Sequence, residues 1–409
     1  MRIKSIRTTE NFTQIIKDIR NSGYIKFNNV QLTGRNIHYP NCLLASNDEL
    51  YSPYDERVMS LKKESFYDNN EFDYTLKTSI NYHKHPVFFF IYNVDNYYHF
   101  IYDSLPILYF YKLLQKEYPL LQLLINTSHP SKQCLPQFVT ESLELLDIKN
   151  IIFPSEDISY DTIFVGTSLT HGGFSNDSPS ELCFPIWNQM IISSNIQYPK
   201  RIYISRRSNL SQNPGNIGTN YTMRRRCNNE DQLVKILEKY NITEVFCEDL
   251  TMNEKIQMFS NAELILGFIG GGMANCIFSK PSTKVLCLVS PTFLEINKRF
   301  AHSMNHTQVT YLYNCIHAPS KRKYTLYTRV KIVDIHSKYF SQIGEIENID
   351  NEIYTITISR NDVAGFSQDF KMEVIEIAEE FLEPLDGGLN SPFICDLNPI
   401  EKYLNILSI

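Results

Sequence analysis

The chain has 409 residues, 43% of them hydrophobic, which suits two or three domains with cores of their own. Its net charge of -6 provides no general basic field for nucleic acid or anionic lipid. The charged N-terminus lacks the apolar segment of a secretory signal, and no apolar run is long enough to span a bilayer. We therefore expect a cytoplasmic protein without a transmembrane segment or a nucleic-acid partner, while peripheral contact with a membrane stays open.

The nine cysteines are scattered singly and form no C-x-x-C pair. This spacing argues against a disulfide framework and against a structural zinc site. We expect reduced thiols in the core and no metal site.

Regular structure is expected from Val87 onward. Residues 1–86 mix short apolar runs with polar stretches, which predicts a peripheral segment of strands and loops. Apolar strands are then predicted at 87–92, 120–126, 150–153 and 162–166. Helices are predicted between them at 96–114 and 138–146, and after the last strand near 185–195. Apolar residues on both faces are typical of parallel central strands. The pattern predicts a first Rossmann-like lobe over 87–198.

The first predicted helix carries two residues suited to proton transfer. His99 and Asp103 are four residues apart and so share one helix face. Pro106 lacks the N–H that would bond to the carbonyl of Tyr102, so we expect the helix to kink or restart there. A carboxylate at such a break, among aromatic residues, can act as a general base, here with His99 orienting it. The alternative is a structural His-Asp pair that only holds the helix.

A second α/β series begins at Arg201. Strands are predicted at 201–205, 243–247, 262–267 and 284–289, and helices at 230–240 and 252–262. These elements predict a second Rossmann-like lobe over 199–323, with a ligand cleft between the two lobes at the carboxyl ends of the strands. Arg206 directly follows the first of these strands and could bind a diphosphate bidentately. The triplet Arg224-Arg225-Arg226 offers Arg225 as a second candidate, although arginines in loops are mostly solvated.

A glycine-rich turn follows the strand at 262–267. Gly270, Gly271 and Gly272 lie between this strand and a segment that can continue as a helix. Glycines remove the Cβ atoms, so main-chain N–H groups and the helix N-terminus could meet a phosphate, with Asn275 one helical turn further on. A purely structural glycine-rich connection is the alternative, and the motif alone does not decide between the two.

The C-terminal part differs in character. From residue 324 short strands alternate polar and apolar residues, which predicts a small all-β, SH3-like module followed by a terminal helix within 324–409. An RNA-binding role for this module is disfavoured because the segment is acidic and offers no basic face.

Five segments together resemble a known family. They are NYYHFIYDSLP, RIYISRR, RRRCNNEDQL, EDLTMNEKIQMFSNAELILG and GFIGGGMANCIFSKPSTKVLCL. In this order, within about 87–315, they resemble the glycosyltransferase 61 family. The resemblance implies a GT-B-like α/β fold with two lobes, a nucleotide-sugar donor bound mainly by the second lobe, and inverting transfer without an obligatory metal or other cofactor.

The chain departs from the family pattern at two positions. The glycine motif of the family usually has His where this chain has Ile269, and an acidic residue where it has Cys287. Neither side chain here can make the hydrogen bonds of its family counterpart. Glu295, just beyond that strand, is a candidate for the missing carboxylate.

The resemblance thus implies an inverting glycosyltransferase with a nucleotide-sugar donor and a glycan or polysaccharide hydroxyl as acceptor. We expect UDP as the nucleotide of the donor. Asp103 with His99 would activate that hydroxyl, and Arg206 with the glycine turn would stabilise the departing diphosphate. The alternative is a catalytically silent glycan- or nucleotide-binding protein on the same scaffold.

Overall fold

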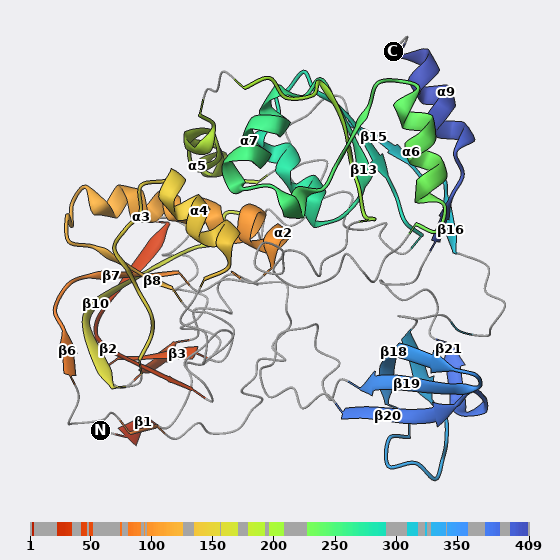
Figure 1. Ribbon diagram of the computed structural model, residues 1–409. Helices are drawn as coiled ribbons and strands as arrows, with labels where there is room; N and C mark the ends of the chain where they lie inside the picture. The colour runs from red at the N-terminus through yellow and green to blue at the C-terminus, as the bar shows by residue number, and fades with distance from the viewer. Residues whose placement is uncertain are drawn as a thin grey trace. The chain divides into compact units, whose positions relative to one another are not determined.

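The computed structural model describes residues 2–3, 23–34, 42–46, 49–51, 74–75, 81–90, 94, 96–125, 135–155, 157–170, 179–192, 196–207, 227–291, 309–317, 324, 329–340, 342–358, 373–384 and 393–407. The chain divides into two compact units. The first comprises Met1–Ser193 with Thr251–Asn253, and the second comprises Ser194–Leu250 with Glu254–Ile409. Figure 1 labels the elements of both units.

The first unit is built on a mixed sheet of strand order β4-β3-β2-β10-β7-β8-β9. Its parallel part consists of β10 (Ile158–Gly166), β7 (Val87–Phe90), β8 (Gln122–Ile125) and β9 (Ile151–Ile152). All four residues of β7 are buried, as expected for a central strand with both faces covered. The predicted parallel α/β character of this lobe is confirmed.

The N-terminal strands join this sheet. β2 (Tyr24–Gly34) pairs antiparallel with β10, and β3 (Cys42–Ser46) and β4 (Glu49–Tyr51) continue the sheet beyond it. β6 (Asn81–His83) pairs parallel with β10, while β1 (Arg2–Ile3) and β5 (Tyr74–Thr75) form a separate pair. The described strands β2 to β4 thus extend the lobe instead of forming a peripheral segment, because the long β2 supplies β10 with a pairing edge.

The helices of the first unit follow the predicted order. They are α2 (Tyr97–His99), the π-helix η1 (Phe100–Ser104), the 3-10 helix η2 (Leu105–Ile107), α3 (Leu108–Gln115), α4 (Gln137–Leu145), the 3-10 helix η4 (Glu181–Cys183) and α5 (Phe184–Met190). The break expected at Pro106 is confirmed, since the helix changes type twice around it. Figure 1 shows α3 and α4 along one side of the strands.

The second unit contains a parallel sheet of order β12-β11-β13-β14-β15. Its strands are β12 (Thr243–Val245), β11 (Arg201–Ile204), β13 (Leu264–Phe268), β14 (Lys284–Leu288) and β15 (Val309–Leu312). The connections are α6 (Glu230–Glu238), the 3-10 helix η6 (Cys247–Asp249), α7 (Met252–Asn261) and the 3-10 helix η7 (Gly271–Phe278). The second predicted α/β series is confirmed.

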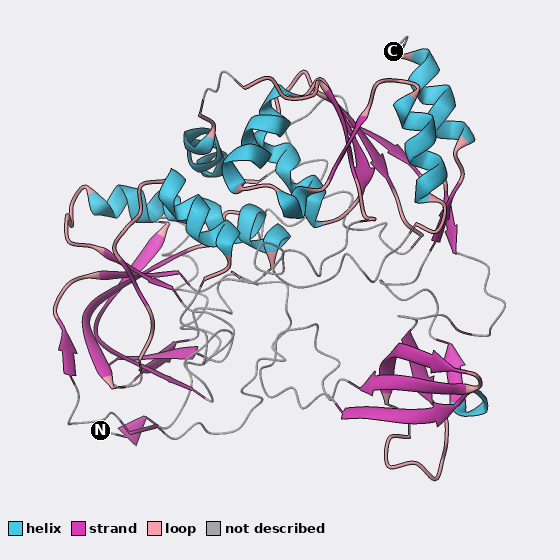
Figure 2. Cartoon of the chain, viewed as in Figure 1, coloured by secondary structure: helices cyan, strands magenta, loops and turns pink. Residues whose placement is uncertain are grey.

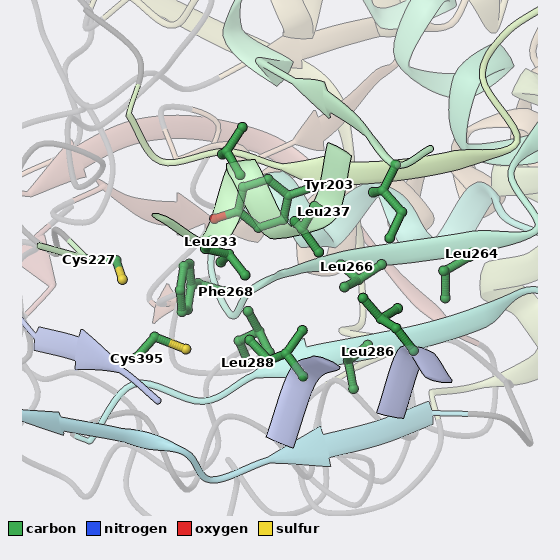
Figure 3. Packing of buried hydrophobic residues seen from close by; sticks show 14 of the residues in the cluster. Tyr203, Cys227, Leu233, Leu237, Leu264, Leu266, Phe268, Leu286, Leu288 and Cys395 are labelled. Carbon is green, nitrogen blue, oxygen red and sulfur yellow. The ribbon is translucent and has the colours of Figure 1, made fainter. Parts of the chain in front are cut away.

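The C-terminal helix packs into the core of this lobe. α9 (Asn398–Ile406) buries Ile400 and Leu404 in one hydrophobic cluster with Leu233 and Leu237 of α6. Figure 3 shows the central part of this cluster around Tyr203 and Phe268. The helix was expected to belong with the small β module, but its apolar face completes the α/β core instead.

The β module is inserted between two paired strands of the second unit. β16 (Cys315–His317) and β22 (Phe393–Cys395) are antiparallel neighbours, and the module lies between them in sequence. It has a five-stranded antiparallel sheet of order β20-β19-β18-β17-β21, drawn as arrows in Figure 2. The strands are β17 (Arg329–Ile332), β18 (Ile343–Asp350), β19 (Ile353–Ile358), β20 (Glu373–Ala378) and β21 (Leu382–Pro384), with the 3-10 helix η8 (Glu379–Phe381) before the last.

The all-β character of this module is confirmed, and the module has a hydrophobic cluster of its own around Tyr354 and Ile356. Its SH3-like class and the GT-B class of the lobes stay predictions. Within the described part of the chain, no helix is both long and apolar enough to cross a membrane.

Candidate functional site

The strand order of the second unit makes one edge of its sheet a candidate ligand site. β11 has β12 on one side and β13 on the other, so the connections that follow β11 and β13 leave the sheet on opposite sides. In open parallel sheets such a switch point opens a crevice at the carboxyl ends of the strands, where ligands bind. Arg206 follows β11, and the glycine turn follows β13.

The side chain of Arg206 lies against the glycine turn. A Cβ atom at Gly270 would stand 2.6 Å from Nη1 of Arg206, so only a glycine leaves room for the guanidinium. Arg206 is 8% exposed, and this burial lowers its pKa while the nearby Glu230 opposes the shift. A buried guanidinium beside bare main chain is a strong binding group for an anion, because little solvent competes with it.

The three glycines have different surroundings. Gly270 is extended, with φ 169°, so it is needed for space and not for an unusual backbone conformation. A Cβ at Gly272 would stand 2.8 Å from Cγ2 of Ile204, which keeps the turn close to β11. At Gly271, by contrast, no atom of the described residues lies within 4 Å of a Cβ. Among the described residues, nothing therefore crowds Gly271 at the start of η7.

Asn275 stabilises the glycine turn through a side-chain hydrogen bond. Its side chain is fully buried, and its Nδ2 donates a hydrogen bond of 2.9 Å to the carbonyl of Gly272. The same amide lies 4.0 Å from Sγ of Cys247, in the turn that follows β12. The buried amide thus links the glycine turn to the neighbouring connection.

Glu230 supports Arg206 from within the core, and the sequence did not identify it. Its Oε1 accepts hydrogen bonds from the N–H of Arg206 at 2.7 Å, the hydroxyl of Tyr203 at 2.7 Å and the hydroxyl of Ser205 at 3.2 Å. Burial raises the pKa of Glu230, although these donors oppose the shift. As the first residue of α6, it reads in the sequence as an ordinary first-turn acid, and only the fold brings it to β11.

The neighbouring charged candidates have other roles or lie outside the described residues. Arg207 donates from Nε to Oε1 of Glu244 at 2.8 Å and forms an ion pair with Asp231. It is therefore bound to acidic side chains at the surface. Arg225 and Glu295 both fall outside the residues that the structure describes.

The two departures from the family pattern are buried. Ile269 is 2% exposed, and its N–H donates to the carbonyl of Leu288 at 3.1 Å. Cys287 has no exposed surface, and burial raises the pKa of its thiol to about 12, so it is protonated near neutral pH. The side chains at these two positions belong to the core of the lobe.

His99 and Asp103 form a hydrogen-bonded pair in the first unit. Nδ1 of His99 lies 2.7 Å from Oδ2 of Asp103, as their spacing predicts. The imidazole keeps 28% of its surface exposed, whereas the carboxylate has none. Of the two side chains, the imidazole is the one that a dissolved substrate can reach.

Thr170 is the third member of this group. Its hydroxyl donates to Oδ1 of Asp103 at 2.6 Å, so each carboxylate oxygen of Asp103 has a bonded neighbour. Thr170 is fully buried and follows β10, 67 residues away from Asp103 in sequence. No local sequence pattern indicates this contact.

Asp103 lies within the π-helix η1, a rare geometry that is often found at functional sites. The wide turn is fixed by Trp187, whose Nε1 donates to the carbonyl of Ile101 at 3.0 Å. The ring of Trp187 stacks on Tyr102 at a centroid distance of 6.0 Å. The backbone that carries the His-Asp pair is therefore held by packed aromatic rings.

Within the described residues, no group of three or more His, Cys, Asp or Glu side chains is arranged to hold a metal ion.

Comparison with known proteins confirms the family resemblance. The model of the family Glycosyltransferase 61 matches residues 97–286, which include the His-Asp pair, Arg206 and the glycine turn. A comparison with curated proteins finds no match. The family implies glycosyltransferase activity in general, with a sugar donor and a glycan acceptor. Over residues 97–286 the chain is therefore similar to the glycosyltransferase 61 family.

Proposed function

We propose that this protein is an inverting glycosyltransferase that moves a sugar from a nucleotide-sugar donor, with UDP as the nucleotide, to a hydroxyl of a glycan or polysaccharide. The observation that carries the proposal is the position of Arg206 against Gly270 at the switch point of the parallel sheet. A cation and bare main chain at this edge are suited to the diphosphate of a donor.

The residues that bind the donor would act mainly by stabilising negative charge. As the bond between the anomeric carbon and the diphosphate breaks, negative charge grows on the leaving oxygen. Arg206 would stabilise this charge, with Gly271 giving the phosphate close access to the main chain. Asn275 and Glu230 would keep the turn and Arg206 in place, since both are buried and bonded to that backbone.

On the acceptor side, burial favours His99 over Asp103 as the general base. The sequence suggested Asp103 as the base with His99 orienting it, but a carboxylate with no exposed surface is poorly placed to meet a substrate. We therefore assign proton transfer to His99, and to Asp103 the task of fixing the ring through Nδ1. Nε2 is then the ring nitrogen that faces away from Asp103.

The proposed reaction is a single displacement. The acceptor oxygen attacks the anomeric carbon from the face opposite the nucleoside diphosphate, the bond to the diphosphate oxygen breaks, and the hydroxyl proton passes to His99. The configuration at the anomeric carbon inverts in this step. The positive charge of Arg206 would offset the leaving-group charge without an obligatory metal ion.

A nucleotide-release assay tests the proposal. The full-length protein is incubated with a panel of UDP-, GDP-, ADP- and CDP-sugars, with and without EDTA, and the free nucleoside diphosphate is measured. We expect release from at least one donor, with EDTA present, and loss of that release in Arg206→Ala. Binding of a nucleoside diphosphate without any turnover, even with candidate acceptors, would count against an enzyme.

That last outcome would favour the alternative of a catalytically silent glycan- or nucleotide-binding protein. The burial of Ile269 is the observation behind this alternative, because the family histidine at this position has no polar replacement here. The anomeric configuration of any product, read by NMR, tests inversion separately.

A further inference from the structure

Two cysteines face each other where the chain enters and leaves the inserted β module. Cys315 lies in β16, before the module, and Cys395 lies in β22, after it. They are register partners in this antiparallel pair, so their side chains lie on the same face of the two strands. Both are free thiols in the structure. The fold thus brings together two thiols that are far apart in sequence.

The hydrogen bonds around Cys395 show which kind of strand pair this is. The N–H of Asp396 donates to the carbonyl of Asn314 at 2.7 Å, so the strands are bonded through the neighbouring residues. The N–H of Cys395 instead donates to Oδ1 of Asn229 at 2.9 Å, and its carbonyl accepts from Nδ2 of Asn229 at 2.8 Å. Cys315 and Cys395 are therefore a non-hydrogen-bonded pair, in which the Cα atoms are about 4.5 Å apart. That separation lies within the range of about 4.4–6.8 Å that a disulfide needs.

The thiol groups also meet through their side chains. The amide of Asn314 contacts both sulfurs, since Nδ2 donates to Sγ of Cys395 at 3.2 Å and Oδ1 accepts from Sγ of Cys315 at 3.9 Å. A hydrogen bond with the side chain of Cys395 is the first cause of a raised pKa at Cys315, ahead of burial. The two sulfurs are therefore neighbours in the reduced protein.

The two thiols differ in access to solvent. Cys395 is 1% exposed, whereas Cys315 is only partly buried. A small dissolved oxidant can therefore reach Cys315 first, and Cys395 lies behind it as the thiol that completes the bond. This order suits thiol–disulfide exchange, in which an accessible thiolate attacks first and a second thiolate resolves the mixed disulfide.

We propose that Cys315 and Cys395 are a site of reversible disulfide formation that closes the base of the β module. The oxidant is a small disulfide such as glutathione disulfide. The thiolate of Cys315 attacks one sulfur of this oxidant, and one glutathione thiolate leaves. The thiolate of Cys395 then attacks Sγ of Cys315 and displaces the second glutathione. The protein loses two protons and two electrons, and the oxidant takes them up as two thiols.

The bond ties the C-terminal helix to the parallel sheet. Cys395 belongs to the hydrophobic cluster of the α/β lobe, and α9 begins three residues after β22. Cys315 follows β15, the last strand in the order of the sheet. The closed loop contains the whole β module, so cleavage of the module leaves α9 covalently attached to β15. A long closed loop also restricts the unfolded chain, so the oxidised protein should be the more stable form.

Cys227 is a third thiol nearby and the competing partner for Cys395. Figure 3 shows these two cysteines at the same end of the hydrophobic cluster. Sγ of Cys227, however, donates to Oδ1 of Asn229 at 3.2 Å, and the bridge partner of Cys227 is Phe393 and not Cys395. The strand register and the hydrogen bonds thus favour Cys315 as the partner, and Cys227→Ser provides a matched control.

Peptide mapping tests the pair. The full-length protein is incubated with glutathione disulfide or with a reductant, the remaining thiols are alkylated under denaturing conditions, and the digested peptides are identified by mass spectrometry. We expect peptides joined through Cys315 and Cys395 in the oxidised sample, and only alkylated forms of both in the reduced sample. The melting temperature of the oxidised protein should exceed that of the reduced protein by about 5 °C or more.

Single substitutions separate this bond from other reactions of the thiols. Cys315→Ser, at a partly exposed position, should fold, lose the cross-link and remove the difference in melting temperature between the two samples. Cys227→Ser should keep both. A bond between Cys227 and Cys395, or a glutathione adduct at Cys315 that does not proceed to the cross-link, would overturn the inference.

Cleavage of the module provides a readout that does not depend on stability. A protease recognition site is inserted at the two-residue turn Asn351-Glu352 between β18 and β19, and the oxidised protein is cut there. We expect the two fragments to migrate together on a non-reducing denaturing gel and to separate after reduction. In Cys315→Ser they should separate without reduction. Separation of the oxidised fragments that carry both cysteines would show that no bond spans the insertion, and the inference would then be wrong.

Discussion

The guanidinium of Arg206 occupies the space that a side chain at position 270 would need, with Nη1 only 2.6 Å from the ideal Cβ position of Gly270. Gly270→Ala should therefore displace the guanidinium, which is flexible enough to move without unfolding the lobe. We expect the affinity for a nucleoside diphosphate to fall about tenfold or more, since a charge-assisted contact is lost. Calorimetry measures the affinity, and thermal unfolding without ligand checks the fold.

A double-mutant cycle identifies the cause of this loss. In the Arg206→Ala background the space beside Gly270 is vacant, so adding Gly270→Ala should cost little further affinity. Fully additive losses would mean that the two residues act independently, and the proposed clamp would then be wrong.

At Gly271, unlike at Gly270, an added methyl group should meet no described side chain. Because no atom of the described residues lies within 4 Å of its ideal Cβ, Gly271→Ala should fold normally. It should even stabilise the protein by about 0.4–1 kcal/mol by restricting the unfolded chain. If a phosphate approaches this face, the added methyl group will weaken diphosphate binding despite the higher stability. Higher stability with unchanged binding would place the ligand elsewhere.

The sequence predicts the local elements of the site but not the hydrogen bonds between distant residues. The strands, the glycine turn and the Arg206 position follow from local patterns, because burial and chain direction fix them within a few residues. The contact of Glu230 with Arg206 spans 24 residues, and that of Thr170 with Asp103 spans 67. Such hydrogen bonds depend on how separate elements pack, which hydrophobic periodicity does not encode.

The sequence pattern also does not show which helices and strands pack or pair with one another. The pattern at 398–404 predicts a helix, but it does not say which core its apolar face completes. In the structure that core belongs to the α/β lobe, where Leu404 packs with Leu237. Likewise, the place of β2 beside β10 depends on pairing across more than a hundred residues. The proposed assignment of His99 as the base likewise depends on the exposure of the two side chains, which the sequence does not give.

The His99 assignment predicts different effects along the hydrogen-bonded group. His99→Ala should lower kcat by about 10²–10⁴-fold, the usual contribution of a general base, without changing donor affinity. Thr170→Val removes the donor to Oδ1 of Asp103 and should lower kcat by about tenfold to a hundredfold through misplacement of the ring. Single-turnover rates and nucleotide affinity separate chemistry from binding.

Thr170→Ser is the matched control for this group. It keeps the hydroxyl and should retain most of the rate. If Thr170→Val and Thr170→Ser behave alike, the hydrogen bond to Asp103 does not matter for turnover. If His99→Ala keeps most of its activity, the base is another group.

Because burial raises the pKa of Glu230, we expect the free energy of unfolding to depend on pH. Burial raises its pKa in the folded protein above the value of 4.5 expected for an unfolded chain. The folded state therefore binds this proton more tightly, so the stabilising contribution is fully present below pH 4.5 and is lost as the pH rises through the folded pKa. Glu230→Gln carries no such proton. The free energy of unfolding of the native protein minus that of Glu230→Gln should fall as the pH rises from below 4.5 through the raised pKa of the folded protein.

Urea denaturation at several pH values measures this difference. Glu238→Gln, on the exposed side of the same helix, is the control and should show little change, because a solvated surface charge contributes little to stability. A difference between the native protein and Glu230→Gln that does not vary with pH would mean that Glu230 does not titrate as its burial implies.

Because the β module lies in sequence between the paired strands β16 and β22, we expect the α/β lobe to fold without it. His317 of β16 is the register partner of Phe393 of β22, so the ends of these antiparallel strands are close enough for a two-residue turn. The module has a separate hydrophobic cluster, whereas Phe393 and Cys395 belong to the cluster of the lobe.

Replacing residues 318–392 by Asn-Gly should therefore give a soluble protein with its α/β core intact. Because Arg206 and the glycine turn lie outside the deleted segment, its affinity for the nucleoside diphosphate should stay within about threefold of the native value. A cooperative thermal transition with lost binding would place part of the donor site in the module, and aggregation would show that the module is needed for the fold.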